Sequence, residues 1–80
     1  MFFTVRYDYG WNILDEHGHT IFNENKLYIT RFINGYCIVK SGNYNCSKYD
    51  IYNENLVKLN KEPFERINIM RFEETGEIKS

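Results

Sequence analysis

The residues best suited to chemistry in this 80-residue chain are two histidines and two cysteines. His17 and His19 flank a glycine and follow Glu16, which makes this the cluster that most resembles a metal site. Gly18 places the two histidines across a turn, however, and a third ligand would have to come from elsewhere in the chain. We therefore interpret both histidines as exposed turn residues and predict no metal site.

Cys37 and Cys46 allow two other kinds of chemistry. If the chain turned tightly at Ser41-Gly42, the two cysteines would lie opposite each other in a hairpin, where a disulfide is conceivable. In a reducing compartment we expect small buried thiols instead. A nucleophilic Cys37 would need a base beside it, and the spacing brings neither histidine close. We predict no catalytic residue and no cofactor, and a small metal- or thiol-dependent enzyme is the alternative function.

Aromatic side chains are the strongest compositional signal, with six Phe, seven Tyr and one Trp. Each buried ring removes roughly 150–250 Å² from water, so rings can build the core of a short chain. So small a domain can hardly shield all of them, and exposed Tyr beside Arg is typical of protein-binding hot spots. Stacking on single-stranded nucleic acid is a rival use of the same rings. The predicted binding residues are Arg6, Tyr28, Arg31, Tyr36, Tyr44, Tyr49 and Tyr52.

The charge is balanced, with ten basic and eleven acidic residues. Nucleic-acid binders usually carry a basic stripe that neutralises phosphates, so we do not expect nucleic acid as a direct ligand. A DNA mimic would need a clear acidic excess. No apolar segment approaches membrane-spanning length and Met1-Phe2-Phe3 lacks a basic leader, so we expect a cytoplasmic protein without membrane contact.

Period-two alternation and turn residues predict a mainly β fold, an antiparallel meander of hairpins in one domain, residues 1–80. The clearest signal is Asn34-Gly35 between two apolar runs, because Asn-Gly suits a two-residue type I′ turn. Both faces of this hairpin are largely apolar, so it is either buried on both sides or open to a partner. Its register pairs Phe32 with Cys37, Arg31 with Ile38, and Thr30 with Val39. Other turns are predicted at 15–18, 41–43 and 53–55, and strands at 3–9, 11–15, 19–22, 27–33, 36–40, 49–52 and 56–59.

The segment 61–75 fits two structures. Asn60 could cap a short C-terminal helix with Phe64, Ile67 and Met70 on one stripe and Gly76 beyond its end. The alternative is a turn followed by a strand over 67–72. We favour the strand, because every earlier segment follows a hairpin spacing.

Two segments of the chain resemble each other. Residues 11–17 and 49–55 each begin with an aromatic residue, carry Ile at the third position and run into a polar turn, as repeated supersecondary units do. In these segments and in 32–39, the chain resembles WG-repeat proteins over roughly residues 9 to 67, with Asn12 and Asp50 where the family has Gly. The resemblance implies a β-rich interaction module without an assigned catalytic activity.

These expectations converge on a non-enzymatic domain that docks a sheet face or edge on a partner protein. The small size and a composition typical of A/T-rich bacterial or phage genomes suit a phage-encoded inhibitor of a host defence complex, of the anti-CRISPR type. Strand edges also pair with copies of themselves, so we expect that a homodimer can form through an edge strand.

Overall fold

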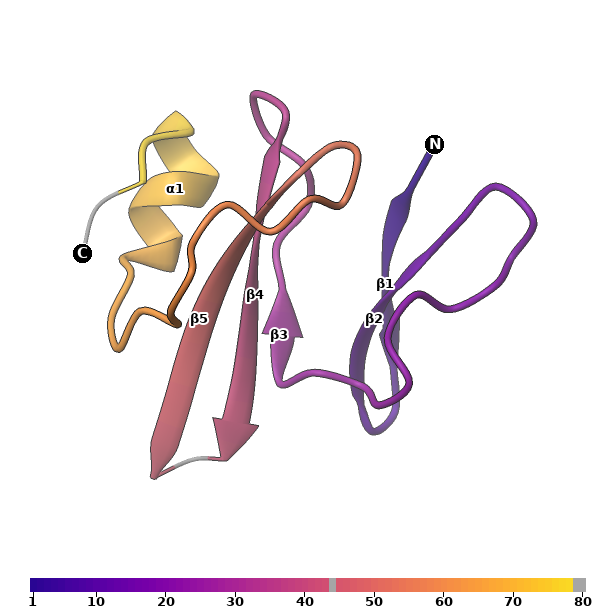
Figure 1. The fold of residues 1–80 in the computed structure, drawn as a ribbon, viewed down its shortest axis with the longest axis horizontal. Coiled ribbons are helices and arrows are strands. Elements are labelled where there is room, and N and C mark those ends of the chain that lie inside the picture. Colours follow the sequence, from indigo (N-terminus) through magenta and orange to yellow (C-terminus); the bar gives the residue numbers. More distant parts are fainter. Residues whose placement is uncertain (44, 79–80) are drawn as a thin grey trace.

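The computed structural model describes residues 1–43 and 45–78 and confirms a mainly β fold with one short C-terminal helix. One sheet pairs β1 with β2, and the other has the strand order β3-β4-β5 (Figure 1). No helix in the described part of the chain is both long and apolar enough to span a bilayer. The elements are β1 (Phe3–Tyr7), β2 (Gly10–Leu14), β3 (Tyr28–Ile29), β4 (Tyr36–Asn43), β5 (Cys46–Asn53) and α1 (Ile69–Thr75).

The first hairpin leads into the predicted turn at 15–18. Tyr7 pairs with Gly10, so β1 ends before the predicted residue 9 and Gly10 begins β2. In the next turn the N–H of Gly18 donates to the carbonyl of Asp15 at 3.1 Å, and Gly18 adopts a φ of 83° that favours glycine. The strand predicted at 19–22 is wrong, because this segment returns along β2 through an isolated bridge and irregular backbone.

The type I′ turn predicted at Asn34-Gly35 is confirmed. Asn34 and Gly35 have φ values of 52° and 83°, the left-handed conformation that this turn requires at both positions. Ile33 and Tyr36 exchange backbone hydrogen bonds of 2.8 and 3.0 Å across it. Local sequence therefore determines this turn.

Thr30 shifts the pairing beyond that turn by one residue. Its hydroxyl accepts the N–H of Ile38 at 2.9 Å in place of a backbone carbonyl, which acts as a bulge. Ile29 therefore lies opposite Val39. The strand predicted at 27–33 is reduced to Tyr28–Ile29. The predicted pairs Thr30–Val39, Arg31–Ile38 and Phe32–Cys37 are therefore wrong.

β4 and β5 form the longest hairpin, and its turn lies later in the chain than expected. The turn predicted at 41–43 is wrong, because β4 continues to Asn43, which pairs with Cys46. The side-chain oxygen of Asn43 accepts the backbone N–H groups of Asn45 at 3.0 Å and Cys46 at 2.8 Å. These hydrogen bonds stabilise a turn after Asn43, so the chain reverses direction later than the predicted turn at 41–43.

The C-terminal segment forms the helix α1, so the strand favoured at 67–72 is wrong. The side chain of Asn68 caps its first turn, and Gly76 ends it with a φ of 77°. Asn60 is not the cap, because its side chain accepts the N–H of Ile51 at 2.9 Å. Phe72 of α1 is fully buried. This tertiary contact favours the helix, and local periodicity could not reveal it.

Backbone hydrogen bonds repeat along the chain with an offset of 38 residues, which confirms the internal repeat. We define unit 1 as residues 3–26 and unit 2 as residues 36–64. In each unit a strand, a polar turn and an irregular return are joined by the same pattern of backbone hydrogen bonds. The bonds that pair the strand with the return are between 2.7 and 2.9 Å long. The equivalent pairs are Trp11–Lys26 and Tyr49–Phe64, and Ile13–Ile21 and Ile51–Leu59.

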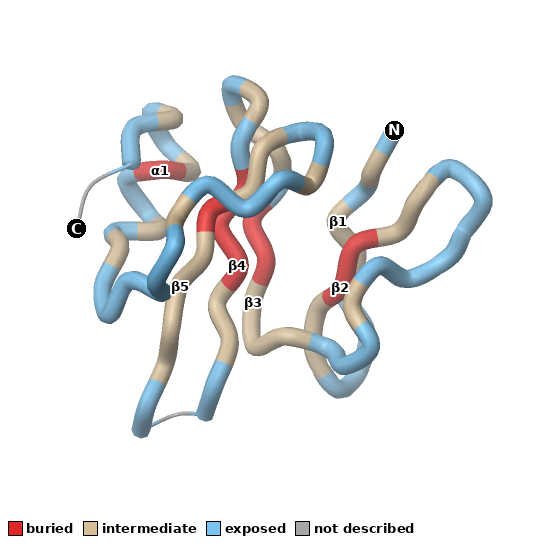
Figure 2. Tube along the Cα trace, viewed as in Figure 1, coloured by how far each residue is buried: buried red, intermediate tan, exposed pale blue. Residues whose placement is uncertain are grey.

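The two units stack on each other, and α1 covers the outer face of unit 2 (Figure 1). One buried cluster lies between the units and contains Ile13, Ile29, Cys37 and Val39. A second lies between unit 2 and α1 and contains Ile38, Ile51 and Phe72. β4 is thus buried on both faces. Figure 2 shows buried segments in β2 to β5 and in α1, whereas β1 has none.

Candidate functional site

Tyr28, one of the predicted binding residues, is held inside the fold. Its ring meets Trp11 edge-on with centroids 4.6 Å apart, and its hydroxyl donates a 2.9 Å hydrogen bond to Glu73 of α1. Burial raises the pKa of Tyr28, and the Glu73 carboxylate raises this pKa further. The side chain therefore links β3 to α1.

Tyr49 and Tyr52 of β5 are also used internally. Tyr52 packs against the cluster between the units and meets Phe22 edge-on, with centroids 5.7 Å apart. Tyr49 packs against the cluster beneath α1, and the Nζ of Lys40 lies 5.9 Å from its ring centroid. Both rings are partly buried and contribute to packing inside the domain.

The other predicted binding residues lie on separate surfaces. Arg6 is exposed and lines a polar cleft of about 510 Å³ with Trp11 and Lys26. Arg31 is exposed, and Tyr36 is 39% exposed beside an apolar groove. Tyr44 lies outside the described residues. The described members of the predicted set therefore divide between internal packing, two different clefts and, for Arg31, exposed surface outside the clefts.

The histidine turn is exposed and is organised by Asp15. His17 and His19 have ring centroids 6.3 Å apart, and the Nδ1 of His19 lies 3.6 Å from an Asp15 oxygen. The backbone N–H of His19 is the largest cause that lowers the pKa of Asp15. Within residues 1–43 and 45–78, no three His, Cys, Asp or Glu side chains gather as metal ligands would.

The two cysteines lie far apart in the second hairpin. Cys37 pairs with Tyr52 and Cys46 pairs with Asn43, so their predicted opposition is wrong. Both thiols are free, Cys37 buried and Cys46 exposed. Burial raises the pKa of Cys37 to about 12, so its thiol stays protonated at neutral pH. Cys37 therefore packs in the core, where burial disfavours the thiolate form of its side chain.

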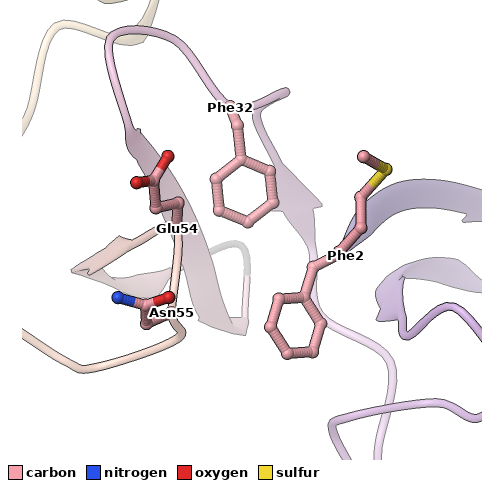
Figure 3. Close-up of a pocket in the computed structure, with 5 residues that line it drawn as sticks. Phe2, Phe32, Glu54 and Asn55 are labelled. Carbon is pink, nitrogen blue, oxygen red and sulfur yellow. The ribbon is translucent and has the colours of Figure 1, made fainter.

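A first apolar cleft opens between the N-terminus and the 53–55 turn. It has a volume of about 380 Å³ and is lined by Met1, Phe2, Phe32, Glu54 and Asn55. Figure 3 shows the rings of Phe2 and Phe32 on one side and the polar ends of Glu54 and Asn55 on the other. Phe2 and Phe32 also pack against the cluster between the units, so these rings serve the core as well as the cleft.

A second cleft, which we call the C-terminal groove, is the more apolar surface. Its volume is about 400 Å³. Four of its large side chains are more than a third exposed: Tyr36 at 39%, Leu59 at 49%, Phe64 at 41% and Ile78 at 38%. The groove is lined by Tyr36, Ile51, Leu59, Asn60, Phe64, Gly76 and Ile78.

Asn60 is the one amide side chain among the residues that line the C-terminal groove, and it is already satisfied. Its nitrogen donates to Asp50 at 2.9 Å and to the carbonyl of Glu62 at 2.7 Å, while its oxygen accepts from Ile51. An occupant gains no strong polar partner from this amide. The groove therefore favours apolar side chains.

Sequence reasoning found Tyr36 but missed Leu59, Phe64 and Ile78. The alternation of Val57, Lys58 and Leu59 was the available signal, since it suggested a segment with an apolar side. That side could be assigned to the core as easily as to the surface.

Comparison with protein-family models, curated proteins and solved structures finds no match to the chain.

Proposed function

We propose that this protein is a non-enzymatic binding domain that docks on a partner protein through the C-terminal groove. The observation that carries the proposal is the gathering of four large, exposed apolar side chains around one concave surface. Contiguous exposed apolar surface is costly in water, and such patches commonly mark protein-binding sites. The partner would supply one or two apolar anchor residues, which a groove of about 400 Å³ can accept.

The rival functions receive less support from the geometry. Nucleophilic chemistry at Cys37 would need its thiolate, which burial disfavours by raising the pKa of this thiol to about 12. Stacking on single-stranded nucleic acid would need free aromatic faces, whereas Tyr28 and Tyr52 pack edge-on against other rings. Kinship with WG-repeat proteins is part of the proposal, and the 38-residue repeat of hydrogen bonds supports it.

The groove is tested by a charge placed inside it and by the same charge placed beside it. Leu59→Glu puts a carboxylate in the groove, whereas Val57→Glu puts one on the same return segment, at a residue that is 55% exposed and outside the groove lining. The tagged protein and both variants would be used to capture partners from a bacterial lysate. We expect wild type and Val57→Glu to retain the same protein and Leu59→Glu to lose it.

Circular dichroism would verify that both variants fold. Photo-crosslinking from Tyr36 should label the captured partner directly. Equal capture by Leu59→Glu and wild type would show that the groove is not the docking surface.

The specific form that we propose is inhibition of a host defence complex, supported by the small size and the composition of the chain. Addition of the protein to CRISPR effector complexes, with target cleavage as the readout, tests this form. We expect wild type and Val57→Glu to slow cleavage and Leu59→Glu to leave it unchanged. An unchanged rate at saturating wild-type protein would remove the inhibitor function but leave docking on another partner intact.

A further inference from the structure

The outer edge of β1 pairs with no further strand among the described residues, whereas the equivalent edge of β4 pairs with β3. Along β4, the N–H of Leu27 donates to the carbonyl of Lys40 at 2.9 Å, and the N–H of Thr30 donates to the carbonyl of Ile38 at 3.0 Å. The segment between the two units therefore supplies a short strand, β3, to the edge of unit 2.

Thr4 and Arg6 occupy the matching positions in β1. Because the hairpin closes at Tyr7 and Gly10, the backbones of Phe3, Val5 and Tyr7 bond to β2, while those of Thr4 and Arg6 point outward. Among the described residues, no backbone hydrogen bond joins Thr4 or Arg6 to a segment outside the hairpin. Their N–H and carbonyl groups remain open to a further strand.

The outward face of β1 also resembles a surface that is buried in unit 2. Phe3 and Val5 correspond to Cys37 and Val39, which are 0% and 2% exposed because unit 1 covers them. Phe3 is 48% exposed and Tyr7, four residues further along the same face, is 41% exposed. One end of the stack thus presents apolar side chains next to an open strand edge.

The other end of the stack is closed, which limits how copies of the chain can associate. Phe72 of α1 packs on Ile38 and Ile51, where the stacking face of a third unit would lie. Capping of this kind prevents repeat units from adding indefinitely. Stacking of copies head to tail is therefore blocked by α1, and a symmetric arrangement that uses the open edge joins β1 to β1 across a two-fold axis.

We propose that two copies of this chain form an antiparallel dimer through the outer edges of β1, with Val5 facing Val5 on the two-fold axis. In this register Thr4 of each copy exchanges backbone hydrogen bonds with Arg6 of the other, which uses the open groups. Phe3 faces Tyr7 of the second copy, an aromatic pair that stabilises antiparallel strands. If the pairing were centred on Arg6 instead, the two Arg6 side chains would face each other and their positive charges would repel. The interface is small, so the dimer should be weak and depend on concentration.

Single cysteines test the register directly. In a Cys46→Ser background, Val5→Cys would place two thiols opposite each other, whereas Thr4→Cys and Arg6→Cys would not. Under mild oxidation we expect an intermolecular disulfide from Val5→Cys and little from the other two. Efficient crosslinking at residue 4 or 6, or at none of the three, would overturn the proposed pairing.

Analytical ultracentrifugation over a hundredfold range of protein concentration measures the oligomeric state, and so tests pairing through the β1 edge without introducing cysteines. Arg6→Pro removes an outward N–H that β2 does not use, and proline is tolerated at such edge positions. Arg6→Ala keeps the N–H and is the matched control. We expect wild type and Arg6→Ala to dimerise and Arg6→Pro to stay monomeric with an unchanged circular dichroism spectrum. A wild-type monomer at the highest concentration would overturn the dimer. The C-terminal groove lies on the other unit, so its capture assay is independent of this result.

Discussion

Asp15 and Asn53 close the same turn in the two units, 38 positions apart. The Oδ1 of each accepts the backbone N–H of the residue two positions later at 2.9 Å, and that of the residue four positions later at 2.9 Å for Asp15 and 3.0 Å for Asn53. Gly18 and Leu56 hold equivalent left-handed positions, with φ values of 83° and 61°. In each unit, one side-chain oxygen therefore holds the turn that leads into the return segment. In unit 2 it does so although the left-handed residue, Leu56, is not glycine.

Replacement of Asp15 by Asn should change how stability depends on pH. The N–H of His19 is the first cause that holds the pKa of Asp15 below its usual range. The unfolded carboxyl therefore takes up a proton at a higher pH than the folded one. The stabilisation from Asp15 is present above the unfolded pKa and is lost as the pH falls through the folded pKa. In urea unfolding, Asp15→Asn should lose less stability than wild type over this acidic range, and identical acid profiles would contradict the assignment.

Removal of Phe72 should destabilise the whole stack. Phe72 is fully buried between α1 and unit 2, so Phe72→Ala removes a ring from a packed core. We expect a loss of about 3–5 kcal/mol in the free energy of unfolding. Met70, in the same helix, is 72% exposed, and Met70→Ala should change this free energy by less than about 0.5 kcal/mol. Similar losses from the two variants, measured by chemical denaturation, would show that α1 is not a cap.

Replacement of the buried Asn12 should lower the stability of the fold. It is 2% exposed, and its oxygen accepts from the N–H groups of Ile13 at 2.8 Å and Phe22 at 3.1 Å. Asn12→Leu would leave these donors without an acceptor, which costs about 1–3 kcal/mol for each buried group that stays unsatisfied. Asn25→Ala removes one partner of the Asn12 amide and should cost less. Thermal unfolding of both variants measures the difference, and a neutral Asn12→Leu would refute this role.

The two thiols should react at very different rates. Cys46 is exposed, whereas Cys37 is buried and its pKa is raised to about 12. Iodoacetamide at mildly alkaline pH should therefore label Cys46 quickly and Cys37 only as fast as the chain opens. Mass spectrometry of timed samples measures both rates, with Cys46→Ser as the control. Rapid labelling of Cys37 in the native protein would contradict its burial.

Burial of Cys37 also makes stability depend on alkaline pH. Above the pKa of the unfolded thiol, the unfolded state ionises while the folded state stays neutral. The contribution of Cys37 is therefore complete below the unfolded pKa and is lost as the pH rises toward about 12. Cys37→Ala should lower stability at neutral pH but flatten this alkaline decline. An equally steep decline in the variant would assign the effect to other groups, such as Tyr28 and Tyr52, whose pKa values are also raised.

The sequence by itself determined the features that depend on neighbouring residues. Asn34-Gly35 specifies its turn because both positions require a positive φ. The repeat was visible because residues 11–17 and 49–55 carry the same order of aromatic, apolar and turn residues. The mainly β fold followed from the same local alternation.

Only the tertiary structure decided the features that depend on distant contacts. Thr30 shifts the register because its hydroxyl reaches the N–H of Ile38 on the other side of the Asn34-Gly35 turn. The segment 69–75 became a helix because Phe72 fills the space above unit 2. The C-terminal groove was likewise hidden, because alternation shows that Leu59 has an apolar side but not whether another segment covers that side. Packing between elements decides that question, and it depends on which elements meet in space.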